Sequence, residues 1–138
     1  MNEAMEQEIK ESRKTAEHFL LHPKLTSGIQ LTADKNEQMW MLAVQIAVET
    51  LNPMRRIFLD IRRKVEKEKQ NGFGVGRHGW VARTQIRFAD ELEKEHIFYN
   101  AVPGERTMKT WWRELVGRVV EIHLRLQLKE KIKTGGTI

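Results

Sequence analysis

Residues 38–51, QMWMLAVQIAVETL, decide the fold because they are apolar on nearly every face of a helix. A helix of this kind must be enclosed by its neighbours. Asp34 is a good N-cap residue, and Glu37 follows it at capping-box spacing. Asn52 and Pro53 directly follow the run and end the helix, and Asn52 is also a good N-cap for the next one. The apolar part is too short to span a bilayer, so the sequence predicts a buried central helix over residues 34–51.

The length of 138 residues fits a single domain over residues 1–138. The chain has no cysteine, which excludes disulfides, thiol nucleophiles and cysteine-ligated metal centres. Residues 1–14 lack the apolar core of a secretory signal. We therefore expect a cytoplasmic protein that does not enter a membrane, and no cofactor or metal ion is expected.

The net charge of +5 is unevenly distributed along the chain. Residues 1–52 carry 5 Lys/Arg against 8 Asp/Glu, residues 53–70 carry 7 against 3, and residues 71–138 carry 12 against 8. The three blocks therefore have net charges of −3, +4 and +4. An acidic first third followed by a basic remainder fits a polyanionic partner on one side of the molecule. It fits an ordinary basic soluble protein equally well.

Helical periodicity recurs on both sides of the central run. Apolar residues at helical spacing predict an amphipathic helix over 3–21, a helix over 53–70 and a helix over about 84–94. The last segment, residues 105–133, is ambiguous. It reads as one long helix, or as a helix to Gly117 followed by a strand in which Ile122, Leu124, Leu126 and Leu128 alternate with polar residues.

The fold class predicted from these patterns is mainly α. It is a small helical domain around the buried central helix (34–51), and a short β element near 25–32, 96–102 or 119–129 stays open as an alternative.

The helix over 53–70 carries four arginines, Arg55, Arg56, Arg62 and Arg63. Residues seven apart return to nearly the same angle on a helix, so we expect these guanidinium groups largely on the outer side. Arginines one turn apart can follow the phosphates of a nucleic acid, and each neutralised phosphate adds affinity through counterion release. The alternative is a solvated helix face that pairs internally with neighbouring carboxylates.

Further cationic and aromatic residues lie in two later stretches. A glycine-rich stretch over 71–84, which we expect to form a cationic loop, carries Arg77 and Arg83, and it follows a charged helix rather than the apolar strand that a dinucleotide fingerprint requires. Trp111 and Trp112 point about 100° apart on a helix, so one can enter the core while the other stays at the surface. We take Trp111 as the exposed indole, which with Lys109 and Arg113 would make a stacking platform for a base. Both indoles filling the core is the alternative.

Two patterns of catalytic or metal-binding type are weak. His18 and His22 lie four apart, where one metal could bridge them, but the third ligand and the general base of a zincin motif are missing. The acidic cluster over residues 90–95 continues a helical pattern and is interpreted as surface. No nucleophile and base stand at a useful spacing, so we do not expect an enzyme.

Two short resemblances follow from these residues. Residues 82–118 loosely resemble a helix-turn-helix unit with TMKTWWRELVGR as its basic recognition helix, although a dozen residues separate the helices where the usual turn has about three or four. The stretch DKNEQMW resembles part of the NinB-type phage recombination proteins, but their strand-rich start is missing here. Neither assigns the chain to a family.

Two functional hypotheses result. The first is a non-enzymatic protein that binds DNA or RNA through Arg55, Arg56, Arg62, Arg63, Arg77, Arg83, Lys109 and Arg113 on phosphates and a tryptophan on bases. The alternative is a helical protein-interaction module (an adaptor, an inhibitor or a small subunit of a larger complex). It would self-associate, as a homodimer for example, through the apolar face of residues 115–128.

Overall fold

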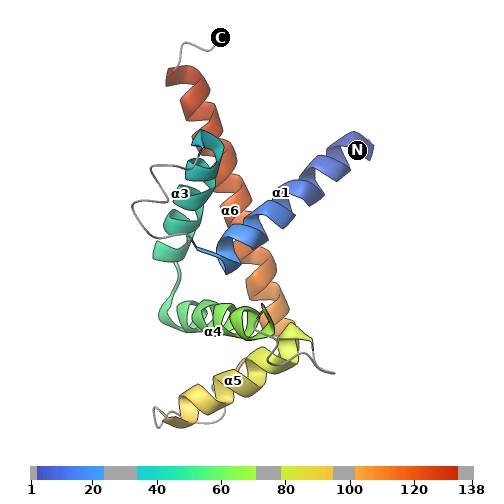
Figure 1. Cartoon of the computed structure of the whole chain (residues 1–138), viewed down its shortest axis with the longest axis vertical. Helices are drawn as coiled ribbons and strands as arrows, with labels where there is room; N and C mark the ends of the chain where they lie inside the picture. The colour runs from blue at the N-terminus through green and yellow to red at the C-terminus, as the bar shows by residue number, and fades with distance from the viewer. Residues whose placement is uncertain (1–2, 24–33, 71–78, 95–101, 134–138) are drawn as a thin grey trace. The chain divides into compact units, whose positions relative to one another are not determined.

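The computed structural model describes residues 3–23, 34–70, 79–94 and 102–133. These residues form five α-helices and no strand: α1 (Glu3–Leu21), α3 (Lys35–Glu49), α4 (Pro53–Gln70), α5 (Trp80–Lys94) and α6 (Glu105–Lys133) (Figure 1). The predicted mainly α fold is therefore confirmed. The chain divides into two compact units, Met1–Thr50 with Glu114–Ile138 (unit 1) and Leu51–Arg113 (unit 2). A single domain over residues 1–138 stays a prediction.

Unit 1 consists of α1, α3 and the part of α6 from Glu114 onward. α3 begins as the sequence predicts, because Asp34 Oδ1 accepts a hydrogen bond of 2.8 Å from the Glu37 N–H and satisfies a free donor of the first turn. The helix buries only one side, with Trp40, Ala43, Val44 and Ala47.

The prediction that α3 is enclosed on every face is wrong. Leu42 is 43% exposed, and it shares an exposed stripe with Gln38, Gln45 and Glu49. These four residues recur at three- or four-residue steps, so they lie on one side of the helix. Three polar side chains at this spacing are enough to turn that side towards solvent within a largely apolar run.

Aromatic rings join the three helices of unit 1. Phe19 of α1 stacks on Trp40 of α3, with ring centroids 6.3 Å apart, and Trp40 stacks on His123 of α6 at 3.6 Å and an interplanar angle of 9°. His123 Nε2 lies 3.1 Å from Asn36 Oδ1. Burial lowers the pKa of His123, because a charged imidazolium loses water in this position.

Unit 2 consists of α4, α5 and α6 up to Arg113. α4 and α5 lie side by side (Figure 1). Their fully buried side chains include Phe58, Leu59, Ile61 and Phe88. At the rim of this contact Lys64 Nζ lies 3.0 Å from Glu91 Oε1, and the hydrogen bond from the ammonium lowers the pKa of the Glu91 carboxyl.

The strand alternative for residues 119–129 is wrong, because they lie within the continuous helix α6, and Gly117 is inside that helix rather than at a joint. Buried residues recur there at helical spacing (Val119, Ile122 and His123), whereas Leu124 and Leu128 are exposed. The candidate strand over 25–32 lies outside the described residues, and so does the candidate over 96–102 except for Val102, which is not in a strand. Within the described ranges no helix combines the length and apolar character needed to cross a bilayer.

Candidate nucleic-acid interface

Arg62 is a core residue of unit 2, which corrects the prediction that it faces solvent. It is 6% exposed, and its guanidinium carbon lies 4.4 Å from the ring centroid of Trp80 and 4.9 Å from that of Trp112. Its Nη1 lies 3.4 Å from Glu66 Oε2. The indole faces and the Glu66 carboxylate take the place of water around the planar guanidinium group. A phosphate does not reach a group in this position.

The physical reason for the difference lies in the neighbours of Arg62 on α4. Arg62 comes four residues after Phe58 and three before Val65, and both of these are buried. Residues at these steps share one helix face. The core-facing stripe therefore passes through Arg62, and two tryptophans distant in sequence complete its surroundings.

Arg55 and Trp111 are brought together by α4 and the first turns of α6. The Arg55 guanidinium carbon lies 5.5 Å from the Trp111 ring centroid, and Trp111 meets Phe58 edge to face at 5.7 Å. Both Arg55 and Trp111 are half-buried, whereas Trp112 is buried. One of the two adjacent indoles enters the core, and the other is half-buried rather than exposed. Trp111 keeps a partly exposed ring held by a fixed aromatic neighbour.

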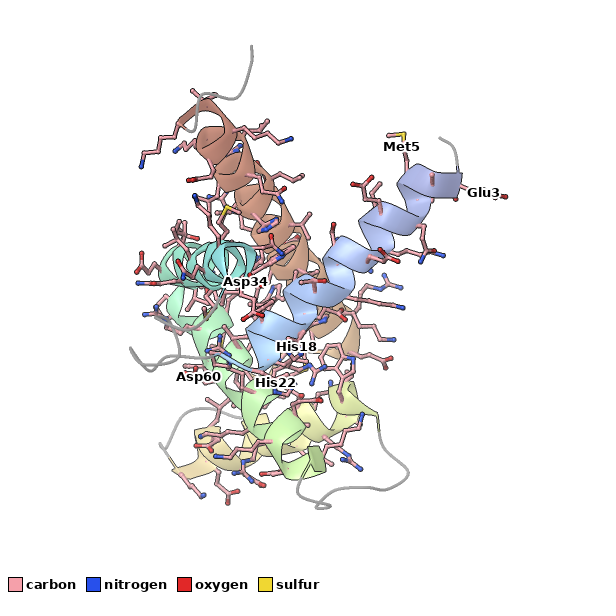
Figure 2. The ribbon with its side chains drawn as sticks, turned by 45° about the horizontal axis from the view of Figure 1, so that its top comes forward. Glu3, Met5, His18, His22, Asp34 and Asp60 are labelled. Carbon is pink, nitrogen blue, oxygen red and sulfur yellow. The ribbon has the colours of Figure 1, made fainter. Side chains whose placement is uncertain are left out.

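Arg56 and Arg63 lie on the outer side of α4. Arg56 is exposed and Arg63 is half-buried. Burial lowers the pKa of the Arg63 guanidinium, and the neighbouring Asp60, labelled in Figure 2, opposes that shift. Lys67 is exposed four residues after Arg63 and belongs to the same side. The sequence analysis missed Lys67, although its spacing from Arg63 was a sufficient signal.

The structure does not place the other predicted site residues beside Trp111 or the outer side of α4. Lys109 Nζ lies 2.8 Å from Glu105 Oε1, and this hydrogen bond lowers the pKa of the Glu105 carboxyl. Arg113 is exposed on the same face as Lys109, but Trp111 lies two residues from each and therefore about half a turn away. Arg83 lies within helix α5 and is half-buried there, so the prediction that it belongs to a loop is wrong; Arg77 lies outside the described residues.

The segment that resembles a recognition helix is the beginning of a much longer one. TMKTWWRELVGR continues without a break to the end of α6, which has 29 residues. Met108 and Trp112 of this segment are buried. The surface that a major groove would meet is therefore limited to the side of Lys109 and Arg113.

Within the part of the chain that the structure describes, neither the histidine pair nor the acidic cluster forms a metal centre. His18 and His22 lie near the C-terminal end of α1, with ring centroids 5.0 Å apart (Figure 2). The described residues contain no group of three or more side chains that could hold a metal ion. Asp90 and Glu93 are exposed on α5, and Glu91 is paired with Lys64.

Comparisons with known proteins give neither a family nor a function for this chain. No protein-family model matches the chain, and no curated protein and no solved structure matches it significantly.

Proposed function

We propose that this chain is a non-enzymatic cytoplasmic protein that binds nucleic acid through Trp111 and the basic outer side of α4. One observation carries the proposal. The half-buried Trp111 ring is fixed against Phe58 and has the Arg55 guanidinium 5.5 Å from its centroid. A base can stack on an indole that is already held in place, and a cation beside it can bind the adjoining phosphate.

The arginines of α4 supply the electrostatic part of this binding. Arg55 lies beside Trp111, while the adjacent Arg56 points about 100° away and is exposed. Arg63 and Lys67 follow Arg56 on the outer side, at roughly 10 Å and 17 Å from it along the helix axis. Each phosphate bound by one of these groups releases counterions, so affinity must fall as salt rises. The block of residues 53–70 as a whole carries 7 Lys/Arg against 3 Asp/Glu, and this net charge of +4 favours a polyanionic partner for α4.

The test compares two double variants with the same charge. Arg55→Ala with Arg56→Ala removes the proposed contacts, and Lys10→Ala with Lys14→Ala removes two positive charges from the acidic helix α1; each lowers the net charge from +5 to +3. Binding of labelled oligonucleotides is followed by fluorescence anisotropy over a salt series. Arg62 is left unchanged, because its removal would disturb the core of unit 2.

For a single strand each phosphate contact contributes about 0.7 to the slope of log K against log salt, so we expect the Arg55/Arg56 variant to lose about 1.4. The Lys10/Lys14 variant should keep the wild-type slope. Trp111→Leu should weaken single-strand binding about tenfold without changing the slope, because stacking carries no charge. Equal slopes for the two double variants would contradict the assignment of the interface to α4.

A second candidate function has its own observation. Leu124, Leu128 and Ile132 are 53%, 60% and 69% exposed and recur every four residues along α6. The chain would then be a helical interaction module that self-associates through its C-terminal segment. Most of the apolar face of residues 115–128 is core, since Leu115, Val116, Val119 and Ile122 are buried, so this surface is narrower and lies further along the helix than predicted. Sedimentation of the wild type and of Leu124→Gln with Leu128→Gln tests it, and a wild type that stays monomeric would exclude it.

A further inference from the structure

The C-terminal part of α6 has a second apolar side with basic edges. Leu124, Leu128 and Ile132, which we call the α6 stripe, recur at i, i+4 and i+8 and are all more than half exposed. Helical angles place the α6 stripe roughly opposite the side that buries Val119 and Ile122. Residues 124–133 contain four basic residues and one acidic residue, a net charge of +3. The α6 stripe is thus an exposed apolar row in a cationic setting.

The first half of α1 has the complementary character. Residues 3–11 are all exposed, and burial on this helix begins further along at Ala16. Met5 and Ile9, which we call the α1 stripe, are 51% and 45% exposed and lie four residues apart. Residues 3–11 contain four acidic residues and one basic residue, a net charge of −3. Glu6 and Glu8 flank the α1 stripe on its two sides.

The two stripes are not laid against each other within unit 1. The N-terminal end of α1, where Figure 2 labels Glu3 and Met5, diverges from the C-terminal end of α6 in both views (Figures 1 and 2). Each stripe is therefore exposed in its own chain. A second copy offers both complementary partners at once.

We propose that two copies of this chain associate by exchange, with residues 3–11 of each copy lying along the α6 stripe of the other; this inference rests on the self-association function. Met5 and Ile9 pack against Leu124, Leu128 and Ile132, and the acidic edge of α1 meets the basic edge of α6. Opposite charges at the rim select this partner and orientation. Lys129 and Lys131 flank the α6 stripe as Glu6 and Glu8 flank the α1 stripe.

Two-fold symmetry doubles the area of the proposed interface. Nine residues of helix span only about 14 Å, and one such contact is smaller than the interfaces of stable complexes. Because the partners are identical, every contact occurs twice in a closed dimer. The exchange therefore covers the α1 stripe and the α6 stripe of both copies and closes these contacts within the dimer.

Sedimentation equilibrium of the full chain with charge reversals on each edge tests the exchange. Glu6→Lys with Glu8→Lys should raise the dimer dissociation constant by about tenfold or more, because four pairs change sign in the symmetric dimer. Glu3→Lys with Glu11→Lys is the matched control, since it gives the same net charge from the opposite side of α1. Lys129→Glu with Lys131→Glu should weaken the dimer similarly, and joining it to the Glu6/Glu8 reversal should restore association.

The outcomes separate the exchange from the function on which it rests. A wild type that is monomeric at every concentration overturns both. A dimer that is lost in Leu124→Gln with Leu128→Gln, yet responds equally to the two α1 reversals or is not restored by the combined reversal, overturns the exchange and leaves self-association standing. Restoration by the combined reversal supports the exchange.

Discussion

Replacing Arg62 by alanine should destabilise the protein rather than act only on ligand binding. The guanidinium group lies over Trp80 at 4.4 Å and over Trp112 at 4.9 Å, and its Nη1 is 3.4 Å from Glu66 Oε2. The side chain is 7% exposed. Arg62→Ala therefore removes two cation–π contacts and the packing of the arginine stem, and it leaves the half-buried Glu66 without this partner.

The size of the effect follows from these contacts. A desolvated cation–π contact is worth about 1–2 kcal/mol, so two contribute about 2–4 kcal/mol. Separating a buried ion pair by removing one partner costs about 3–5 kcal/mol, but Glu66 keeps 19% of its side chain exposed and relaxes towards water. Because the terms overlap, we expect a loss of about 3–4 kcal/mol in the free energy of unfolding. This is a large share of a stability of about 5–15 kcal/mol.

Urea unfolding followed by circular dichroism measures this loss. The control is Arg56→Ala, which removes an exposed arginine from the same helix and should change stability by less than about 0.5 kcal/mol. Arg62→Met keeps the stem volume without the charge and should lose less than Arg62→Ala. If Arg62→Ala is as stable as Arg56→Ala but binds oligonucleotides more weakly, Arg62 is a contact residue and its assignment to the core is refuted.

Three further predictions follow. Asp34→Ala removes the cap on the Glu37 N–H and should cost about 1 kcal/mol of stability, whereas Asp34→Asn should cost much less. Gly117→Ala should stabilise α6 by about 0.5–1 kcal/mol, since a Cβ there meets only Arg13 Nη1, at 3.6 Å; a loss of stability would contradict this packing. Because burial lowers the pKa of His123, the unfolded chain binds its proton at higher pH than the folded chain, so stability is lost as pH falls below about 6.5. His123→Phe keeps a ring in the stack, so its free energy of unfolding should fall less than that of the wild type between about pH 7 and pH 5. If the two proteins lose the same stability, a group other than His123 causes the loss.

Local signals predicted the elements whose limits are set by neighbouring residues. Asp34 caps α3 on the Glu37 N–H, and Asn52 Oδ1 accepts a hydrogen bond of 2.9 Å from the Arg55 N–H at the start of α4. The two residues joined by such a capping hydrogen bond lie within one turn of each other, so the local sequence is enough to predict it. The burial of Trp112 and partial exposure of Trp111 likewise follow from the apolar stripe that Met108 begins.

The burial of Arg62 and the helical structure at the end of α6 were not predictable from local sequence, because both depend on tertiary packing. Reading arginine as a polar surface residue missed that its planar group can lie on indoles, and the tryptophans that cover it come from other helices. In residues 122–128 the strand-like alternation arises because α6 has apolar residues on two sides, one buried and one exposed. The spacing of apolar residues alone does not distinguish a strand from a helix with two apolar sides, since Leu124 and Leu128 fit both patterns.

The most direct test of the proposed function is the salt dependence of oligonucleotide binding by the wild-type protein. Fluorescence anisotropy of a labelled single strand, titrated at several salt concentrations, gives the slope that counterion release determines. The nucleic-acid proposal predicts binding that weakens steeply with salt, with a slope of at least about 1.4 from Arg55 and Arg56 alone. No binding at low salt, or binding that salt does not change, would contradict it.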